Sequence, residues 1–133
     1  DPTRIGIMGF SAGGHLAALA ATSGNERSYP AQDAIDQVSC RADFCALIYP
    51  AYLFKDDKNP GLAPGPGSPP AFLSHSADDG LTYRNSSQFF DALQSHKIQS
   101  ELHLWPDGGH GYGMRSPVTP GAWPSLLAAW LAK

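Results

Sequence analysis

A serine enclosed by glycines, at the junction of two different apolar patterns, restricts the fold of this chain more than any other feature. Residues 4–10 (RIGIMGF) form a short apolar run with two β-branched isoleucines, which predicts a strand buried on both faces. Residues 13–21 place leucines among alanines, which predicts a helix that can lie close to a sheet. No linker separates the two segments, so the strand must turn sharply into the helix at Ser11.

The residues of this turn match the pattern G-x-S-x-G, from Gly9 to Gly13. Both glycines are expected where a Cβ would collide with the crossing strand and helix. The turn would lift the Ser11 hydroxyl clear of the sheet and aim the Ala12 N–H at an oxyanion forming on an attacked carbonyl. The alternative is a serine that only caps the helix between two glycines.

The remaining patterns predict an α/β domain, with a mainly parallel sheet flanked by helices. The segment NPGLAPGPGSPP, within residues 50–70, is too rich in proline and glycine for a helical cap, so we expect a surface loop. No repeat or linker divides the chain, which predicts one domain over residues 1–133. Further strands are expected at residues 44–49, 71–75 and 101–105, and further helices at residues 83–95 and 123–131.

Composition excludes several classes of protein. The formal charge is −3 and the lysines and arginines are scattered singly, so no basic stripe could follow a nucleic acid. No apolar stretch approaches the roughly 18 residues that span a membrane. Cys40 and Cys45 lack the pattern of a zinc site, and their short separation makes a disulfide awkward, so we expect free, partly buried thiols and no metal.

A weakly nucleophilic serine needs a base, and the base needs an acid that orients it. Asp78 and Asp79 directly follow the predicted third strand, at an edge where α/β sheets place their ligands. His110 follows the last strand in a glycine-rich loop, which favours it as the base. Asp79 stays open as an alternative to Asp78. The other histidines are expected to be packing or hydrogen-bonding residues (His15, His75) or solvated ones (His96, His103).

Four segments carry a resemblance that runs through nearly the whole chain. The chain resembles the α/β-hydrolase esterases of the acetylxylan-esterase-like and feruloyl-esterase-like (BD-FAE) group, which are related to the prolyl oligopeptidase hydrolases. The similar segments are RIGIMGFSAGGHLAA around the serine, SCRADFCALIYPAY, PPAFLSHSADD before the acid, and ELHLWPDGGHGYGMR around the histidine.

The resemblance implies a role for each site residue. Ser11 corresponds to the nucleophile, His110 to the base, and Ala12 to one donor of the oxyanion hole. Asp78 corresponds to the acid, because family members carry a valine-like residue three positions later and Leu81 fills that place. The family works without a cofactor, so none is implied here.

One departure from the family concerns what should precede the serine. Family members carry four strands upstream of it, and an HGGG-type loop after one of them supplies the second oxyanion donor. This chain contains neither, so we expect the C-terminal half of an α/β-hydrolase fold, without a cap domain. The strand before Ser11 would then form an apolar edge of the sheet.

The predicted function is a serine carboxylesterase acting on short acyl esters, with a small-molecule or glycan ester such as acetylated xylan as substrate. Trp105 is a candidate for contact with a sugar, although packing at a strand end is the alternative. A glycan substrate would imply a secreted or periplasmic location. Two other classes stay open: a serine peptidase of the prolyl oligopeptidase type, and a scaffold without activity.

Overall fold

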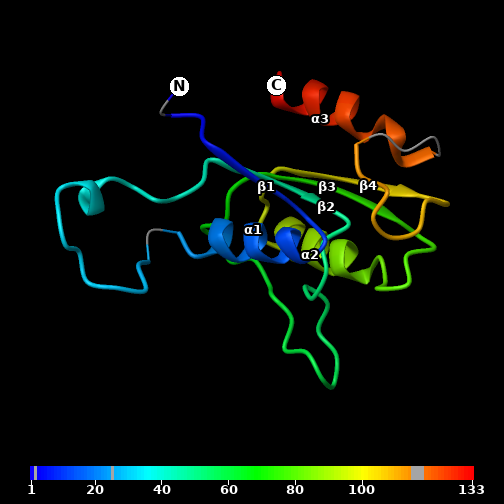
Figure 1. The fold of residues 1–133 in the computed structure, drawn as a ribbon, viewed down its shortest axis with the longest axis horizontal. Helices are drawn as coiled ribbons and strands as arrows, with labels where there is room; N and C mark the ends of the chain where they lie inside the picture. The colour runs from blue at the N-terminus through cyan, green and yellow to red at the C-terminus, as the bar shows by residue number, and fades with distance from the viewer. Residues whose placement is uncertain (2, 25, 115–118) are drawn as a thin grey trace.

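The structure is a computed structural model that describes residues 1, 3–24, 26–114 and 119–133. Four strands form one sheet in the order β1-β2-β3-β4, and every neighbouring pair is parallel. Helices α1 and α2 cover one face of the sheet and α3 covers the other (Figure 1). The predicted α/β class is therefore confirmed, and the carboxyl ends of all four strands meet at one edge.

The elements occur in the predicted order, and their bounds differ from the expected ones by one or two residues. The polar ends of the predicted segments account for these differences, because apolar periodicity locates the middle of an element better than its ends. The strands are β1 (Gly6–Phe10), β2 (Phe44–Ile48), β3 (Ala71–Ser76) and β4 (Ser100–Trp105), and the α-helices are α1 (Ala12–Thr22), α2 (Arg84–Ser95) and α3 (Trp123–Leu131). Two short 3₁₀ turns, η1 (Ile35–Gln37) and η2 (Thr119–Ala122), complete the description.

Strand β1 lies at the edge of the sheet, where β2 is its neighbour. Its side chains are poorly covered: Met8 is 48% exposed, and the adjoining Ile5 is 58% exposed. The prediction of a strand buried on both faces is therefore wrong. The apolar composition of residues 4–10 resembles that of a central strand. At the edge of the sheet, however, part of these apolar side chains lies at the surface. This agrees with the apolar edge strand that the family resemblance led us to expect.

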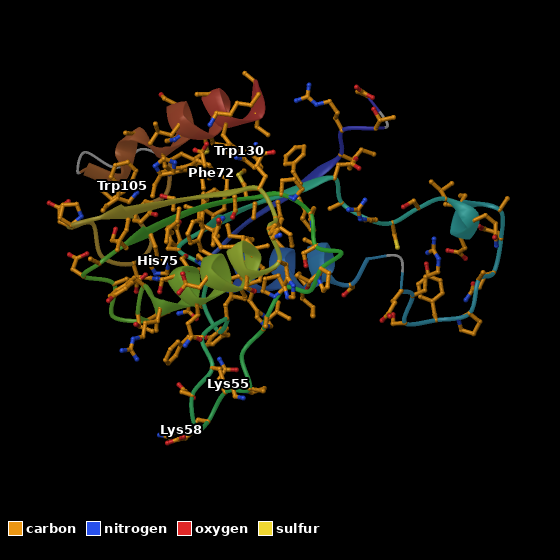
Figure 2. All side chains as sticks on the ribbon, turned by 180° about the vertical axis from the view of Figure 1, so that it is seen from behind. Lys55, Lys58, Phe72, His75, Trp105 and Trp130 are labelled. Atoms are coloured by element: carbon orange, nitrogen blue, oxygen red, sulfur yellow. The ribbon has the colours of Figure 1, made fainter. Side chains whose placement is uncertain are left out.

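Two apolar layers hold the helices to the sheet. The alternation of side chains along β3 sends Ala71, Leu73 and His75 toward α1 and α2, and sends Phe72 and Ser74 toward α3. Figure 2 shows Phe72 and Trp130 between the sheet and α3. The larger layer contains Ala17, Ala18, Ala21, Leu47, Leu53, Leu73, Phe89 and Leu93. The alanines of α1 let its axis approach the sheet closely, as the sequence predicted.

The segment after β2 is a surface loop, as its prolines and glycines predicted. Residues 49–70, all of them described, contain no helix or strand, and Lys55 and Lys58 lie on its projecting part (Figure 2). Buried Asn85 of α2 anchors it: its Oδ1 accepts the N–H groups of Leu53 and Phe54 at 2.8 and 2.9 Å. Asn85 therefore ties the loop to α2 through two hydrogen bonds.

Both cysteines are free thiols, but their surroundings differ. Cys40 is exposed, whereas the expectation was a partly buried thiol. Cys45 is buried in β2, and burial raises its pKa to about 12, so this thiol stays protonated.

Candidate active site

Ser11 lies at the turn between β1 and α1 in a strained backbone conformation, with φ of 52° and ψ of −124°. Such a conformation costs about 1–3 kcal/mol in a residue with a side chain. Hydrogen bonds hold the turn: the Ser11 N–H donates to the Ile48 carbonyl at 3.1 Å, and its own carbonyl accepts the Ala51 N–H at 3.0 Å. The chain on both sides of the β2 terminus thus fixes the serine in place.

The close approach of helix α1 to strand β1 depends on Gly9. A Cβ at Gly9 would lie 2.0 Å from the Gly13 carbonyl oxygen, which no side chain could tolerate. The collision expected at Gly13 itself does not occur, because a Cβ there would meet no atom within 4 Å. Gly14 has the steric requirement instead, since its Cβ would lie 2.9 Å from Pro50. The pattern G-x-S-x-G therefore contains one glycine that the packing demands and one that it does not.

Ala12 is the first residue of α1, next to the serine. Its N–H belongs to the first turn of the helix, where backbone donors lack an intrahelical acceptor. The positive end of the helix dipole lies at the same place. The structure therefore places a backbone donor at the helix N-terminus next to Ser11.

Ser11 and His110 meet although 99 residues of chain separate them. The Ser11 Oγ lies 2.7 Å from His110 Nε2. The loop that follows β4 brings the histidine over the serine, and glycines at positions 108, 109, 111 and 113 give it backbone conformations with positive φ. The two residues singled out in the sequence thus share a hydrogen bond.

Asp79, and not Asp78, lies beside the histidine. Its Oδ2 is 2.7 Å from His110 Nδ1, and its side chain has no exposed surface. Asp78 lies on the exposed side of the turn, where its Oδ1 accepts the N–H of Gly109 at 2.8 Å. The assignment of Asp78 from the position of Leu81 therefore disagrees with this geometry, which favours the alternative that the sequence left open. Spacing along a turn cannot tell which of two adjacent carboxylates points inward.

Three donors surround the Asp79 carboxylate. Oδ2 is shared by His110 and His75, whose Nε2 lies 2.9 Å away, and Oδ1 accepts the Leu81 N–H at 2.7 Å. Burial by itself raises the pKa of Asp79, but the hydrogen bond from His110, the Leu81 N–H and the two imidazoles outweigh it. The pKa of Asp79 therefore lies below its ordinary value, and the carboxylate is ionised at neutral pH.

Two tyrosines that the sequence did not single out support the histidine loop. The Tyr49 ring lies 5.1 Å from the His110 ring and 4.5 Å from the Tyr112 ring. The Tyr112 hydroxyl lies 2.9 Å from Ser74 Oγ, so the loop is tied to β3. Tyr49 has a positive φ of 37°, and an aromatic residue directly after a strand is the only signal that could have pointed to it.

Trp105 lies on the α3 side of the sheet, away from His75 and α2 (Figure 2). Its indole N–H donates to Ser74 Oγ at 2.9 Å, and its ring packs into the layer with Phe72 and Trp130. The single polar group of its side chain is therefore occupied, which favours packing over contact with a sugar.

Three histidines other than His110 differ in their surroundings. His15 makes a ring contact with Tyr52, at 6.1 Å between centroids, and His103 bonds Glu101 at 3.3 Å. His75 is completely buried and bonded at both nitrogens.

The described residues contain no group of three or more histidine, cysteine or acidic side chains that could hold a metal ion. Within the same ranges, no helix has both the length and the apolarity needed to cross a bilayer.

A parallel sheet with the serine on the turn after one strand, and with the acid and the histidine after two later strands, is the arrangement of the α/β hydrolases. The chain adopts this fold, and its similarity to solved α/β hydrolases extends over nearly all of its length. It belongs to the prolyl oligopeptidase family, whose family model matches residues 59–133. The BD-FAE family model matches residues 1–48.

Similar proteins include several esterases. An acetylxylan esterase of Xylanibacter ruminicola is 29% identical over 85% of this chain. An acetyl ester-xyloside bifunctional hydrolase from Caldicellulosiruptor lactoaceticus superimposes with a TM-score of 0.85 over 99% of the chain, at 32% identity. The α/β hydrolase MGS-M1, from a deep-sea metagenome of the Medee basin, gives a TM-score of 0.71 over 98% of the chain, at 27% identity.

The chain spans only part of each of these relatives. It covers 27% of the acetylxylan esterase, 57% of the bifunctional hydrolase and 54% of MGS-M1. The resemblance therefore concerns the segment that carries the serine, the acid and the histidine.

Proposed function

We propose that this chain carries the nucleophile, base and acid of a serine esterase that hydrolyses short acyl esters. One observation supports the proposal above all others: hydrogen bonds join Ser11 to His110 and His110 to Asp79, each at 2.7 Å. In this proposal Asp79 takes the role first expected of Asp78.

The hydrogen bonds suit a two-step acyl transfer. Ser11 Oγ attacks the ester carbonyl while His110 Nε2 takes its proton, and the same histidine then protonates the departing alcohol. Asp79 holds the proton on His110 Nδ1, which keeps Nε2 free as the acceptor and stabilises the imidazolium that forms. The Ala12 N–H stabilises the oxyanion. Water, activated by His110, then releases the acid from Ser11.

The relatives favour an acetylated carbohydrate as substrate. One of them is named an acetylxylan esterase, and another an acetyl ester-xyloside bifunctional hydrolase. The prolines and glycines of residues 49–70 form a loop without a helical cap, which leaves room for a bulky alcohol. We therefore propose an acetyl group on a xylan-type glycan as the first substrate to test.

A peptidase is the second candidate, because the prolyl oligopeptidase family model matches residues 59–133. Ser11, with the help of His110 and Asp79, could also attack an amide carbonyl. A peptidase would differ from an esterase in the groups that bind the peptide rather than in the chemistry of Ser11. A non-catalytic scaffold is the third reading, and it predicts activity toward neither substrate.

The deciding experiment compares p-nitrophenyl acetate, acetylated xylo-oligosaccharides and a chromogenic prolyl peptide, all with the protein at its full natural length. The esterase proposal predicts release of acetate, reduced by about 10⁶-fold in kcat in Ser11→Ala. Hydrolysis of the peptide alone would favour the peptidase. A folded protein inactive on all three, with no covalent labelling of Ser11 by a fluorophosphonate, would leave the scaffold.

A further inference from the structure

His75 is a buried histidine at the end of β3 that the acyl-transfer steps do not use. Its side chain has no exposed surface, and it lies on the α2 side of the sheet (Figure 2). Nε2 lies 2.9 Å from Asp79 Oδ2, and Nδ1 lies 2.8 Å from the Oγ of Ser86 in the first turn of α2. The buried imidazole of His75 is therefore hydrogen-bonded at both nitrogens, and one of its partners is Asp79, the acid of the candidate site.

The ionised carboxylate of Asp79 determines where His75 and His110 carry their protons. Asp79 Oδ2 accepts hydrogen bonds but cannot donate, so His75 Nε2 and His110 Nδ1 must each carry a proton. Burial, the largest effect, lowers the pKa of His75, and the Asp79 carboxylate opposes this only in part. His75 is therefore neutral, its Nδ1 is a lone pair, and the Ser86 hydroxyl donates to it.

We propose that His75 is a positioning residue for the reaction, which holds the Asp79 carboxylate in the orientation that His110 requires, and that Ser86 fixes the His75 ring by a hydrogen bond to its Nδ1. The inference rests on the esterase proposal, because it concerns the same site. The result is a single hydrogen-bonded chain that runs from Ser86 through His75, Asp79 and His110 to Ser11.

The geometry explains why a carboxylate on a turn needs such support. Without the His75 N–H, each oxygen of the Asp79 carboxylate would keep a single donor, His110 at Oδ2 and the Leu81 N–H at Oδ1. The carboxylate could then rotate about its Cβ–Cγ bond, and its shared oxygen would no longer point at His110 Nδ1. Misplacement of a catalytic group by 1 Å can cost about 100-fold in rate, so the effect should appear in kcat.

Ser86 acts one step further from the reaction. If His75 carried its proton on Nδ1, a bare nitrogen lone pair would face the Asp79 oxygen at 2.9 Å, and the two would repel each other. The Ser86 hydroxyl lies on the other side of the ring and occupies Nδ1 as a donor. It thereby satisfies the buried Nδ1 and fixes the ring, so that the Nε2 proton stays directed at Asp79.

The first test uses three variants of the full-length protein with p-nitrophenyl acetate as substrate. His75→Leu removes both polar atoms and should lower kcat by about 10- to 100-fold with KM nearly unchanged. His75→Gln keeps an N–H directed at Asp79 and should recover most of that loss. His103→Leu is the matched control: it removes a half-buried histidine from β4 that does not contact Asp79, and it should keep wild-type kcat.

The second test keeps His75 in place. Ser86→Ala is well tolerated in a helix and should fold even if His75→Leu does not. It leaves the buried Nδ1 of His75 without a donor and lets the ring shift, so kcat should fall by about fivefold. Proton NMR supplies a readout that does not depend on turnover, since the proton between His110 Nδ1 and Asp79 Oδ2 should give a low-field resonance. We expect this resonance to move or broaden in His75→Leu and in Ser86→Ala, and to stay unchanged in His103→Leu.

The outcomes separate the two proposals. A wild-type protein that hydrolyses no ester, but whose low-field resonance responds to His75→Leu, would contradict the esterase and retain the role of His75. An active protein in which Ser86→Ala and a folded His75 variant keep both kcat and the resonance would overturn the positioning role. Equal losses in His75→Gln and His75→Leu, or a loss in His103→Leu of the same size, would also overturn it, because they would indicate a general loss of packing.

Discussion

His110 Nδ1 lies 2.7 Å from Asp79 Oδ2, although the two residues belong to loops that follow different strands. Strands β3 and β4 are parallel neighbours, with Ser76 paired to Trp105 at their carboxyl ends. The acid follows β3 by three residues and the histidine follows β4 by five, so two short loops leave the same edge of the sheet side by side. Parallel pairing, rather than proximity in sequence, brings the two residues together.

The choice between adjacent aspartates gives the first prediction. Asp79→Asn should lower kcat for p-nitrophenyl acetate by about 10⁴-fold, because the amide no longer holds His110 in the required tautomer. Asp78→Asn keeps an oxygen that accepts the Gly109 N–H, so its kcat should change by no more than about twofold. Steady-state kinetics of both variants measure the difference. The reverse order of losses would restore Asp78 as the acid.

The two glycines around the serine give the second prediction. Gly9→Ala should destabilise the protein by about 3 kcal/mol or more, because its Cβ would overlap the Gly13 carbonyl. Gly13→Ala meets no atom in a helix and should be neutral or stabilise by up to about 1 kcal/mol. Urea denaturation, followed by circular dichroism, measures both. A Gly13→Ala variant as unstable as Gly9→Ala would mean that α1 lies differently against β1.

The buried histidine gives a prediction about pH. Burial depresses the pKa of folded His75 below the value of about 6.5 expected in the unfolded chain. The unfolded state therefore binds more protons as the pH falls below about 6.5, and the folded state loses stability there. The loss has an upper limit of about 1.4 kcal/mol per pH unit for this one group.

Urea denaturation between pH 5 and pH 7, values chosen to bracket the ordinary histidine pKa of about 6.5, checks this prediction. The groups that face His75 are the Asp79 carboxylate, the His110 imidazole and the Ser86 hydroxyl. His75→Gln should therefore show a shallower dependence of the free energy of unfolding on pH. An unchanged slope in that variant would contradict the assigned shift of His75.

The loop anchor gives a fourth prediction. Asn85 accepts two backbone N–H groups and donates to the carbonyls of Leu81 and Thr82 at 2.7 and 2.9 Å. Asn85→Ala leaves buried backbone groups without partners and should destabilise the protein by about 2–4 kcal/mol. Asn85→Asp is the companion variant: it keeps the acceptor for Leu53 and Phe54, but it turns a carboxylate oxygen toward the Leu81 and Thr82 carbonyls in place of the donor. Thermal denaturation measures both, and a stable Asn85→Ala would mean that the loop is held by its other contacts.

The sequence by itself determined the α/β class, the order of strands and helices, and the roles expected of a serine on a sharp turn and a histidine in a glycine-rich loop. Apolar periodicity and glycine positions are local properties, so they can be recognised without knowledge of the neighbouring elements. Ser11 and His110 were found in this way, and the structure joins them by a hydrogen bond.

Only the tertiary structure decided which side chains face inward at the shared edge of the sheet. Asp78 and Asp79 are chemically identical and adjacent, and the direction of a side chain on a turn depends on the donors around it, here His75, His110 and the Leu81 backbone. The exposure of Met8 likewise depends on the number of strands that flank β1. These properties arise from contacts between segments distant in sequence, which local patterns do not contain.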